Sequence, residues 1–141
     1  MQIGIRLHDT KKGTLEERVA IAEEQGFSCA HLALKKVISE YSVADSALTP
    51  GFSCYLKNLF AAHHLDIAVL GCYLNLATPD QAVLEKNVHR YMAHIRMASL
   101  LGAGVVGTET GAVNESYSFE ERNHSEESLD ILIKNVSPVE Q

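Results

Sequence analysis

The chain has 141 residues, of which 46% are hydrophobic and 21% are charged. This is enough apolar material for the core of one globular domain, and too much for a disordered chain. Acidic residues outnumber basic ones by 18 to 12, so the basic surplus that non-specific nucleic-acid binding needs is lacking. The longest apolar stretch, residues 67–74, is too short to cross a bilayer. We therefore expect neither nucleic acid nor a membrane as a partner.

The cysteines and the N-terminus predict where the protein works. Cys29, Cys54 and Cys72 are an odd number without a C-x-x-C pair, which is typical of reduced thiols rather than of a disulfide framework or a zinc knuckle. The first twelve residues, MQIGIRLHDTKK, contain no apolar segment behind a basic start, so no secretory signal is expected. These features predict a cytoplasmic protein.

Four short apolar runs predict strands. They cover residues 3–7, 29–34, 67–74 and 105–108. None alternates cleanly between polar and apolar residues, as a half-exposed antiparallel strand would. Short, nearly continuous runs are typical of parallel strands that are covered on both faces.

The segments between the strands predict helices with recognisable starts. Thr14 and Glu17 form a capping-box pattern, and Leu15, Val19 and Ala22 follow at helical spacing. A second helix is expected to start at Thr49–Pro50, because proline is favoured in the first turn.

Two further helices are expected in the second half of the chain. Thr78, Pro79 and Gln81 predict a cap, a first-turn proline and a capping-box glutamine, and Gly102 is expected to end that helix. A last helix is expected from about Ser125, with apolar residues that we predict to point inward; these are Leu129, Leu132 and Ile133.

The resulting β-α-β-α-β-α-β-α order predicts an α/β fold of parallel βα repeats in a single domain over residues 1–141. Two architectures fit four such units: half of a TIM barrel, which in full needs about 250 residues, and a small doubly wound sheet such as a flavodoxin-like one. The turn after the first strand reads LHDTKKG and contains neither G-x-G-x-x-G nor a P-loop, which speaks against nucleotide binding.

The segments GCYLNLATPD (71–80), GAGVVGTETG (102–111) and SEESLDILIKNVSPVEQ (125–141), together with GIRLHDT at the start, resemble the N-terminal half of the xylose isomerase-like TIM barrels. This superfamily contains sugar phosphate isomerases and epimerases as well as apurinic endonucleases. The resemblance runs along essentially the whole chain. It favours the isomerase/epimerase branch, because the endonuclease branch has histidine ligands at the ends of its third and fourth strands. Here those positions read Gly71–Cys72–Tyr73 and Gly107–Thr108–Glu109.

The resemblance implies metal-assisted proton transfer next to the carbonyl of a sugar or sugar phosphate. It also implies a divalent metal (Mn, Mg or Zn) held by two glutamates, an aspartate and a histidine from the fifth strand onward. No residue of this chain matches those positions, so no metal ligand is assigned and no cofactor is expected in this chain alone. We therefore expect a truncated, inactive half barrel. The alternative is a non-enzymatic half barrel or flavodoxin-like domain that binds a partner or a small ligand.

Polar residues at the predicted strand ends are the candidate site residues, because barrel enzymes bind their substrates there. Glu109 is the candidate catalytic residue, as an acid or base or as a ligand of a sugar hydroxyl, or else it is a solvated loop acid. The candidate substrate-binding residues are His8, Tyr73, Asn75 and Thr108. His8 can equally be structural, and Asn75 can equally cap the following turn.

The other histidines and the buried cysteine carry weaker signals. His63 and His64 are adjacent on a predicted helix, so we expect them to point apart and not to share a metal. His31 lies within the second strand and is expected to be an interior group. Cys72 has no neighbouring base and is interpreted as a small buried hydrophobe.

The expectation of half a barrel also predicts that the chain associates with further copies of itself. Cutting the barrel after four units leaves the first and fourth strands unpaired and exposes apolar residues, with Ile3, Ile5, Val69 and Val105 as candidates. We therefore expect a homodimer or a higher oligomer that covers these surfaces.

Overall fold

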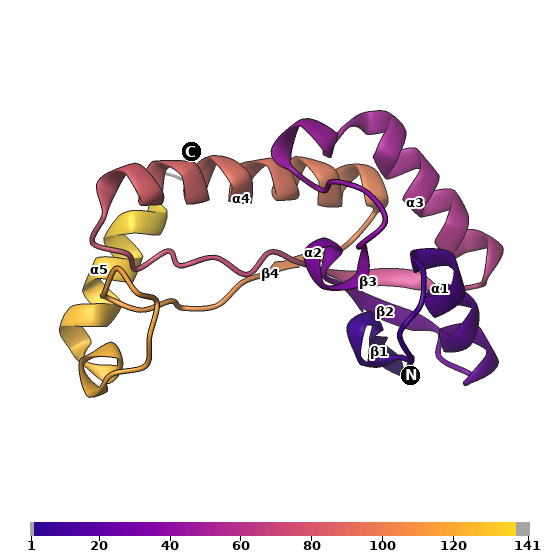
Figure 1. The fold of residues 1–141 in the computed structure, drawn as a ribbon, viewed down its shortest axis with the longest axis horizontal. Helices are drawn as coiled ribbons and strands as arrows, with labels where there is room; N and C mark the ends of the chain where they lie inside the picture. The colour runs from indigo at the N-terminus through magenta and orange to yellow at the C-terminus, as the bar shows by residue number, and fades with distance from the viewer. Residues whose placement is uncertain (1, 138–141) are drawn as a thin grey trace. The chain divides into compact units, whose positions relative to one another are not determined.

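The structure, a computed structural model, describes residues 2–137, so Pro138 to Gln141 lie outside the described residues. Its strands form one parallel sheet in the order β1-β2-β3-β4 (Figure 1). The strands are β1 (Gly4–Arg6), β2 (Cys29–Leu32), β3 (Asp66–Gly71) and β4 (Val105–Gly107). In a TIM barrel each strand pairs with the next one along the chain, whereas a flavodoxin-like sheet has the order 2-1-3-4-5. The half-barrel prediction is confirmed, and the flavodoxin-like alternative is wrong.

The helices lie where the apolar periodicity predicts them. The long helices are α1 (Leu15–Glu24), α3 (Pro50–Ala62), α4 (Gln81–Leu101) and α5 (Glu126–Val136). The sequence did not predict the short elements, which are α2 (Leu34–Val37) and the 3-10 turns η1 (Leu7–Asp9), η2 (Asp45–Ala47) and η3 (Glu121–His124). A single turn of helix is too short to show an apolar period.

The predicted helix starts are confirmed with one exception. The Thr14 side chain accepts from the Glu17 amide at 3.2 Å, and the Glu17 carboxylate accepts from the Thr14 amide at 2.9 Å, which completes the capping box. The prediction of Thr78 as the cap of α4 is wrong. Asp80 takes that role, and its Oδ1 accepts from the amides of Ala82 and Val83 at 2.9 and 3.1 Å. Asp80 also carries a negative charge, which favours the positive end of the helix dipole.

The chain divides into two compact units. Unit 1 comprises residues 1–72 and 93–107 and contains all four strands, and unit 2 comprises residues 73–92 and 108–141. The expectation of one incomplete barrel domain over residues 1–141 stays a prediction.

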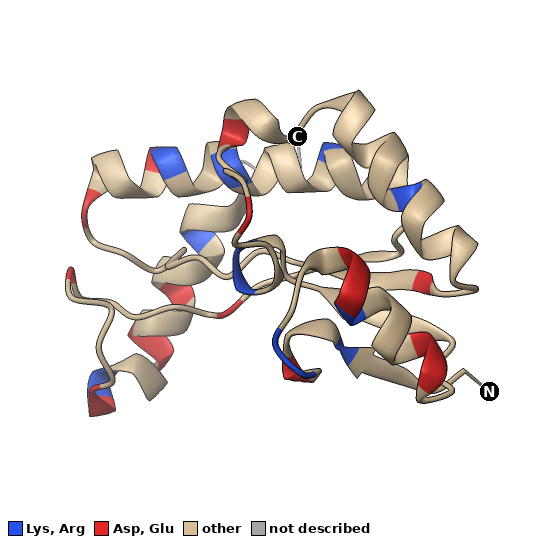
Figure 2. Cartoon of the chain, turned by 45° about the vertical axis from the view of Figure 1, so that its right-hand side comes forward, with Lys and Arg blue, Asp and Glu red and all other residues tan. Residues whose placement is uncertain are grey.

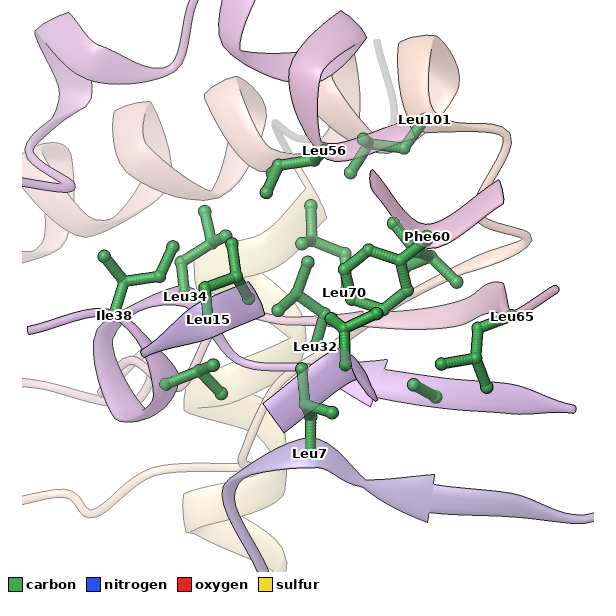
Figure 3. Packing of buried hydrophobic residues seen from close by; sticks show 14 of the residues in the cluster. Leu7, Leu15, Leu32, Leu34, Ile38, Leu56, Phe60, Leu65, Leu70 and Leu101 are labelled. Atoms are coloured by element: carbon green, nitrogen blue, oxygen red, sulfur yellow. The ribbon is translucent and has the colours of Figure 1, made fainter. Parts of the chain in front are cut away.

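Leucine side chains from strands and helices form the core of unit 1 (Figure 3). Leu7, Leu32 and Leu70 come from the sheet side, and they meet Leu15 of α1 and Phe60 of α3; all five are 0–1% exposed. Each such side chain stabilises the fold by about 1.5–3 kcal/mol relative to an exposed one. This core fixes the positions of the strands, and hence of the polar residues that follow them.

The parallel register separates the two faces of the sheet. Ile5, Ala30 and Ile67 lie in one register row and pack into or against the leucine core. Ile5, one of the residues expected to be uncovered, is half-buried and packs against this core. Ile3 and Val105 are exposed as expected, and Val69 is half-buried.

Helix α5 of unit 2 departs from its prediction. Leu132 is half-buried, but Leu129 and Ile133 are 54% and 51% exposed, so the prediction that both point inward is wrong. An apolar stripe at helical spacing predicts that a helix has a packing face, but it does not show which part of a protein covers that face.

Two surface properties follow from the described residues. Lys and Arg lie on several separate helices and loops, interspersed with Asp and Glu (Figure 2). None of the helices within residues 2–137 combines the length and the apolar character that a membrane crossing requires.

Candidate functional site

A polar cluster follows β1 in unit 1. Arg6 is the last residue of the strand, and the turn η1 carries His8 and Asp9. The Nη2 and Nε atoms of Arg6 lie 2.7 and 3.2 Å from Nε2 of His8. The Arg6 Nε also forms an ion pair with Asp9 Oδ2 at 3.4 Å. The cluster therefore presents a guanidinium, an imidazole and a carboxylate at the carboxyl end of the first strand, the end at which barrel enzymes bind substrates.

His31 of β2 joins this cluster. Arg6 and His31 are register partners in the sheet. The rings of His8 and His31 meet edge to face, with centroids 5.7 Å apart and an angle of 80° between their planes. A Cβ atom added at Gly71 would lie 2.4 Å from the Nε2 atom of His31, so in its present position the imidazole packs closely against this glycine of the neighbouring strand.

Both imidazoles are held in the neutral form. Burial lowers the pKa of His8, and the Arg6 guanidinium lowers it further. Burial also lowers the pKa of His31, with His8 as the next cause. Since the ordinary pKa of histidine is 6.5, both rings are uncharged at pH 7. A neutral imidazole can donate one hydrogen bond and accept another, which suits polar ligands.

Arg18 of α1 fixes the loop that carries His8. Its buried guanidinium donates to the carbonyl oxygens of Gly13, Thr10 and Leu7 at 3.1, 3.4 and 3.4 Å. These bonds hold both ends of the segment between β1 and α1. The turn η1 is thereby tied to the leucine core rather than left as a free loop.

A second polar cluster, in unit 2, follows β4. Glu109 lies two residues beyond the strand, outside any helix, and is exposed, as are Thr108 and Thr110. The hydroxyl of Tyr117 donates to Glu109 Oε2 at 2.6 Å. Burial raises the pKa of Tyr117, and the hydrogen bond to Glu109 raises it further, so the phenol stays protonated and remains a donor. Tyr117 therefore limits the positions that the Glu109 carboxylate can take.

Asn75 connects the loops of unit 2. Its Oδ1 accepts from the amides of Ala77 and Ala112 at 3.2 and 2.9 Å, and its Nδ2 donates to the Asn114 carbonyl at 3.4 Å. Gly111 has φ +89° and passes so close that a Cβ atom there would lie 2.3 Å from Asn75 Oδ1. The hydrogen bond from the Ala77 amide is the turn-capping role that the sequence analysis gave as the alternative to substrate binding. The buried side chain uses both of its polar atoms within the protein.

Two other asparagines hold the loop that follows Asn75. Asn87 of α4 donates to the Asn75 carbonyl at 2.8 Å, and Asn135 of α5 donates to the Leu76 carbonyl at 2.9 Å. Side-chain amides thus replace a strand partner for these backbone groups.

Unit 2 also contains a cavity of about 300 Å³ at the start of α5. Its lining includes Thr110, Asn123, His124, Ser125 and Leu129. The Ser125 side chain already caps the helix by accepting from the Ser128 amide at 3.2 Å. The first-turn acids Glu126 and Glu127 make this helix start unsuitable for an anion.

The structure places the predicted site residues in both units. His8 belongs to unit 1, whereas Tyr73, Asn75, Thr108 and Glu109 belong to unit 2. Their roles toward a substrate stay predictions. The sequence analysis did not identify Arg6, His31 or Tyr117 as site residues. Arg6 and His31 could have been noticed, because each is a polar residue within an otherwise apolar strand.

No group of three or more His, Cys, Asp or Glu side chains within residues 2–137 is arranged to hold a metal ion. The donors that the structure describes therefore do not fit the metal that the resemblance implies. Any such metal would need ligands from other residues.

The prediction that His63 and His64 point apart is wrong. His63 Nδ1 lies 2.7 Å from Glu23 Oε2, and His64 Nδ1 lies 2.9 Å from Glu23 Oε1. The rings converge because α3 ends at Ala62 and His64 takes a left-handed conformation with φ +55°. Hydrogen bonds from His64 and then His63 lower the pKa of Glu23, which joins the end of α1 to the end of α3.

Comparisons with known proteins agree with this fold. The family model of the xylose isomerase-like TIM barrel matches residues 19–139, so the chain belongs to this family. A solved structure of D-psicose 3-epimerase with D-tagatose from Clostridium cellulolyticum H10 superposes with a TM-score of 0.69 at 13% identity. A xylose isomerase domain protein from Alicyclobacillus acidocaldarius superposes with a TM-score of 0.59 at 16% identity.

Both matches cover 99% of this chain and 47% of the other chain. The chain thus spans about half the length of these solved structures. At these identities the likeness shows the fold alone. No curated protein matches the chain.

Proposed function

We propose that this chain supplies the first four βα units of an enzyme that isomerises or epimerises a sugar or a sugar phosphate. The observation that carries the proposal is the polar cluster of Arg6, His8 and His31 at the carboxyl ends of β1 and β2, in a chain of the xylose isomerase-like family. The similarity to an epimerase solved with D-tagatose supports a polyhydroxy ketone as the ligand.

The proposed reaction moves a proton on a carbon next to the sugar carbonyl. A base removes this proton, the carbonyl oxygen gains negative charge, and the proton returns either to the other face or to the neighbouring carbon. Neutral donors near the carbonyl oxygen stabilise the developing charge. The His8 imidazole is suited to this task, because it is neutral and shielded from solvent.

Glu109 is proposed to bind a sugar hydroxyl or to act as the acid or base. Its carboxylate is exposed and is held by Tyr117, so it can accept a hydrogen bond from a ligand without first changing its position. Tyr73, Asn75 and Thr108 are proposed as further hydrogen-bonding residues. For Asn75 this role competes with its bonds to the loops of unit 2.

The divalent metal of the family would polarise the sugar carbonyl when bound. The resemblance assigns its ligands to strands that this chain does not contain, and the described residues do not form a site for it. We therefore propose that the 141-residue chain alone is inactive and that activity needs the other half of a barrel.

The test is a metal-supplemented screen of aldose and ketose interconversion, with D-tagatose and D-psicose as the first substrates. It compares this chain with a version extended by four further βα units of the family. Conversion by the extended version alone supports the proposal. Glu109→Gln in that version should lower kcat at least about tenfold, whereas the exposed loop residue Glu115 offers a matched control, Glu115→Gln. If the extended version folds but converts no sugar of the panel, the proposed function is wrong, and binding of a sugar without conversion would then support the non-enzymatic binding domain.

A further inference from the structure

We propose that Arg6 is a positioning residue that holds His8 as a neutral hydrogen-bond donor through Nδ1, and that this donor binds a carbonyl or hydroxyl oxygen of an uncharged sugar. The ligand class rests on the proposed function, whereas the role of Arg6 rests on the geometry alone.

The two bonds from Arg6 fix the tautomer of His8. A guanidinium has only donors and stays protonated in proteins. Because its Nη2 and Nε lie 2.7 and 3.2 Å from His8 Nε2, this nitrogen must accept. The single ring proton of a neutral imidazole is then on Nδ1. A protonated imidazole would carry an N–H on Nε2 as well. That N–H would point at the N–H groups of the guanidinium, so the hydrogen bonds from Arg6 would be lost and two positive charges would repel each other.

The Nδ1 atom of His8 is a donor without an acceptor. It is buried, and it has no hydrogen-bond partner among the residues that the structure describes. The whole side chain is only 9% exposed. Buried polar groups nearly always have a hydrogen-bond partner, because an unpaired donor destabilises the fold. The unpaired Nδ1 atom is therefore a position at which an oxygen atom of a ligand can accept a hydrogen bond.

The surroundings of His8 favour an uncharged oxygen ligand. The charged groups near the ring are Arg6, Lys36 and Arg18, opposed by the Asp9 carboxylate, whose Oδ1 lies 3.9 Å from Nε2. The adjacent His31 ring is half-buried and neutral. An uncharged hydroxyl or carbonyl reaches a shielded donor at a smaller desolvation cost than an anion does. A phosphate ion is the competing ligand, because three of the four charged neighbours are cations.

Access to this donor requires a small movement. Nδ1 is covered by protein atoms in the ligand-free chain, so a bound oxygen must displace part of that cover or turn the ring. Its nitrogen resonance is therefore a direct reporter of binding.

The experiment measures the ring nitrogens of His8 by long-range ¹H–¹⁵N NMR in the complete 141-residue chain, with His8→Gln to assign the resonances. At pH 7 we expect one neutral tautomer with the proton on Nδ1. Arg6→Gln should shift His8 toward the Nε2–H tautomer or a mixture. Arg122→Gln should leave it unchanged; Arg122 is 56% exposed, against 58% for Arg6, and is paired with Glu127. A charged ring, an Nε2–H tautomer in the unmodified chain, or no change in Arg6→Gln overturns the role of Arg6.

The second arm adds D-tagatose and, separately, inorganic phosphate. We expect D-tagatose to shift the Nδ1 resonance saturably, and Arg6→Gln to weaken its binding about tenfold, the worth of one hydrogen bond. A saturable response to phosphate alone overturns the assignment to an uncharged oxygen, and no response to either probe overturns the binding role. Neither arm uses turnover. An Nδ1 shift with D-tagatose in a chain whose extended version is inactive would refute the proposed function and leave this inference intact.

Discussion

The core of unit 1 is a cluster of buried leucines, whereas the loops of unit 2 are held in part by asparagine side chains that bond to the backbone. In unit 1 a parallel sheet pairs its own backbone groups, and leucines fill the space between strands and helices. Within residues 2–137, the segments of unit 2 that follow β3 and β4 are not part of the sheet, and the side chains of Asn75, Asn87 and Asn135 form hydrogen bonds with their backbone groups instead. The comparison teaches that one chain can provide hydrogen-bond partners for its backbone groups either through neighbouring strands or through individual side chains.

The two solutions place different constraints on function. The leucine core of unit 1 disfavours unpaired polar groups, so Arg6 and His8 lie at the end of β1, and His31 lies in β2 beside a glycine of β3. The asparagine bonds leave surface residues such as Glu109 free to face a ligand, but each bond depends on one side chain. Replacement of a single asparagine should therefore destabilise the neighbouring loops of unit 2 without affecting the sheet of unit 1.

The largest expected effect is in the core of unit 1. Phe60→Ala should lower the free energy of unfolding by about 3–5 kcal/mol, because it removes a fully buried ring and leaves a cavity. Urea or thermal unfolding measures this change. Phe119→Ala is the control, since that ring is exposed, and it should cost less than about 0.5 kcal/mol. Equal losses for the two variants would contradict the leucine core as the main source of stability.

A smaller and more local effect is expected in unit 2. Asn75→Ala should lower the free energy of unfolding by about 1–3 kcal/mol, because it leaves the amides of Ala77 and Ala112 without their acceptor. Amide hydrogen exchange should accelerate at these two residues and not in β2 or β3. The exposed Asn58 provides the control, Asn58→Ala. Faster exchange throughout the sheet would show that the two units are not separately stabilised.

The edges of the sheet in unit 1 predict association. Strands β1 and β4 are the two edge strands of the sheet, and both Ile3, just before β1, and Val105, the first residue of β4, are exposed. The isolated chain of 15.5 kDa should therefore form dimers at micromolar concentration in light scattering. Val105→Lys should weaken the dimer by about tenfold or more. The exposed Val83 of α4 is the matched control, as Val83→Lys. A monodisperse monomer that unfolds cooperatively would contradict this prediction.

The smallest effect is the dependence of stability on pH. The pKa values of His8 and His31 are lowered in the folded chain, so below their ordinary value of 6.5 the unfolded chain binds more protons. The free energy of unfolding should therefore fall as the pH is lowered from about 7 to about 5. Replacing both residues by glutamine should flatten this slope. An unchanged slope in the double variant would show that other groups cause it.

Local sequence patterns were sufficient to predict the strands and the long helices. Apolar runs located the four strands, and the periods behind Thr14 and Thr49 located the first two long helices, because these signals depend on neighbouring residues only. The start of α4 was misplaced because Thr78 and Asp80 both have the chemistry of a cap, and the local sequence does not rank them.

The candidate site was only partly predictable. His8 and Glu109 each lie two residues beyond a strand, so the sequence could place both of them at strand ends. Tyr117, eight residues after Glu109, could not be linked to it, because a loop without periodicity gives no rule for which side chains meet.

The sequence by itself determined the kind and order of the strands and long helices, the absence of a basic surplus and the resemblance to a barrel family. Only the tertiary structure decided that β1 and β2 are neighbours in the register that sets Arg6 opposite His31, and that the turn after β1 brings His8 against both. Strand order and register arise from how the leucines of separate segments pack together. That packing is a property of residues far apart in the chain, and no local pattern encodes it.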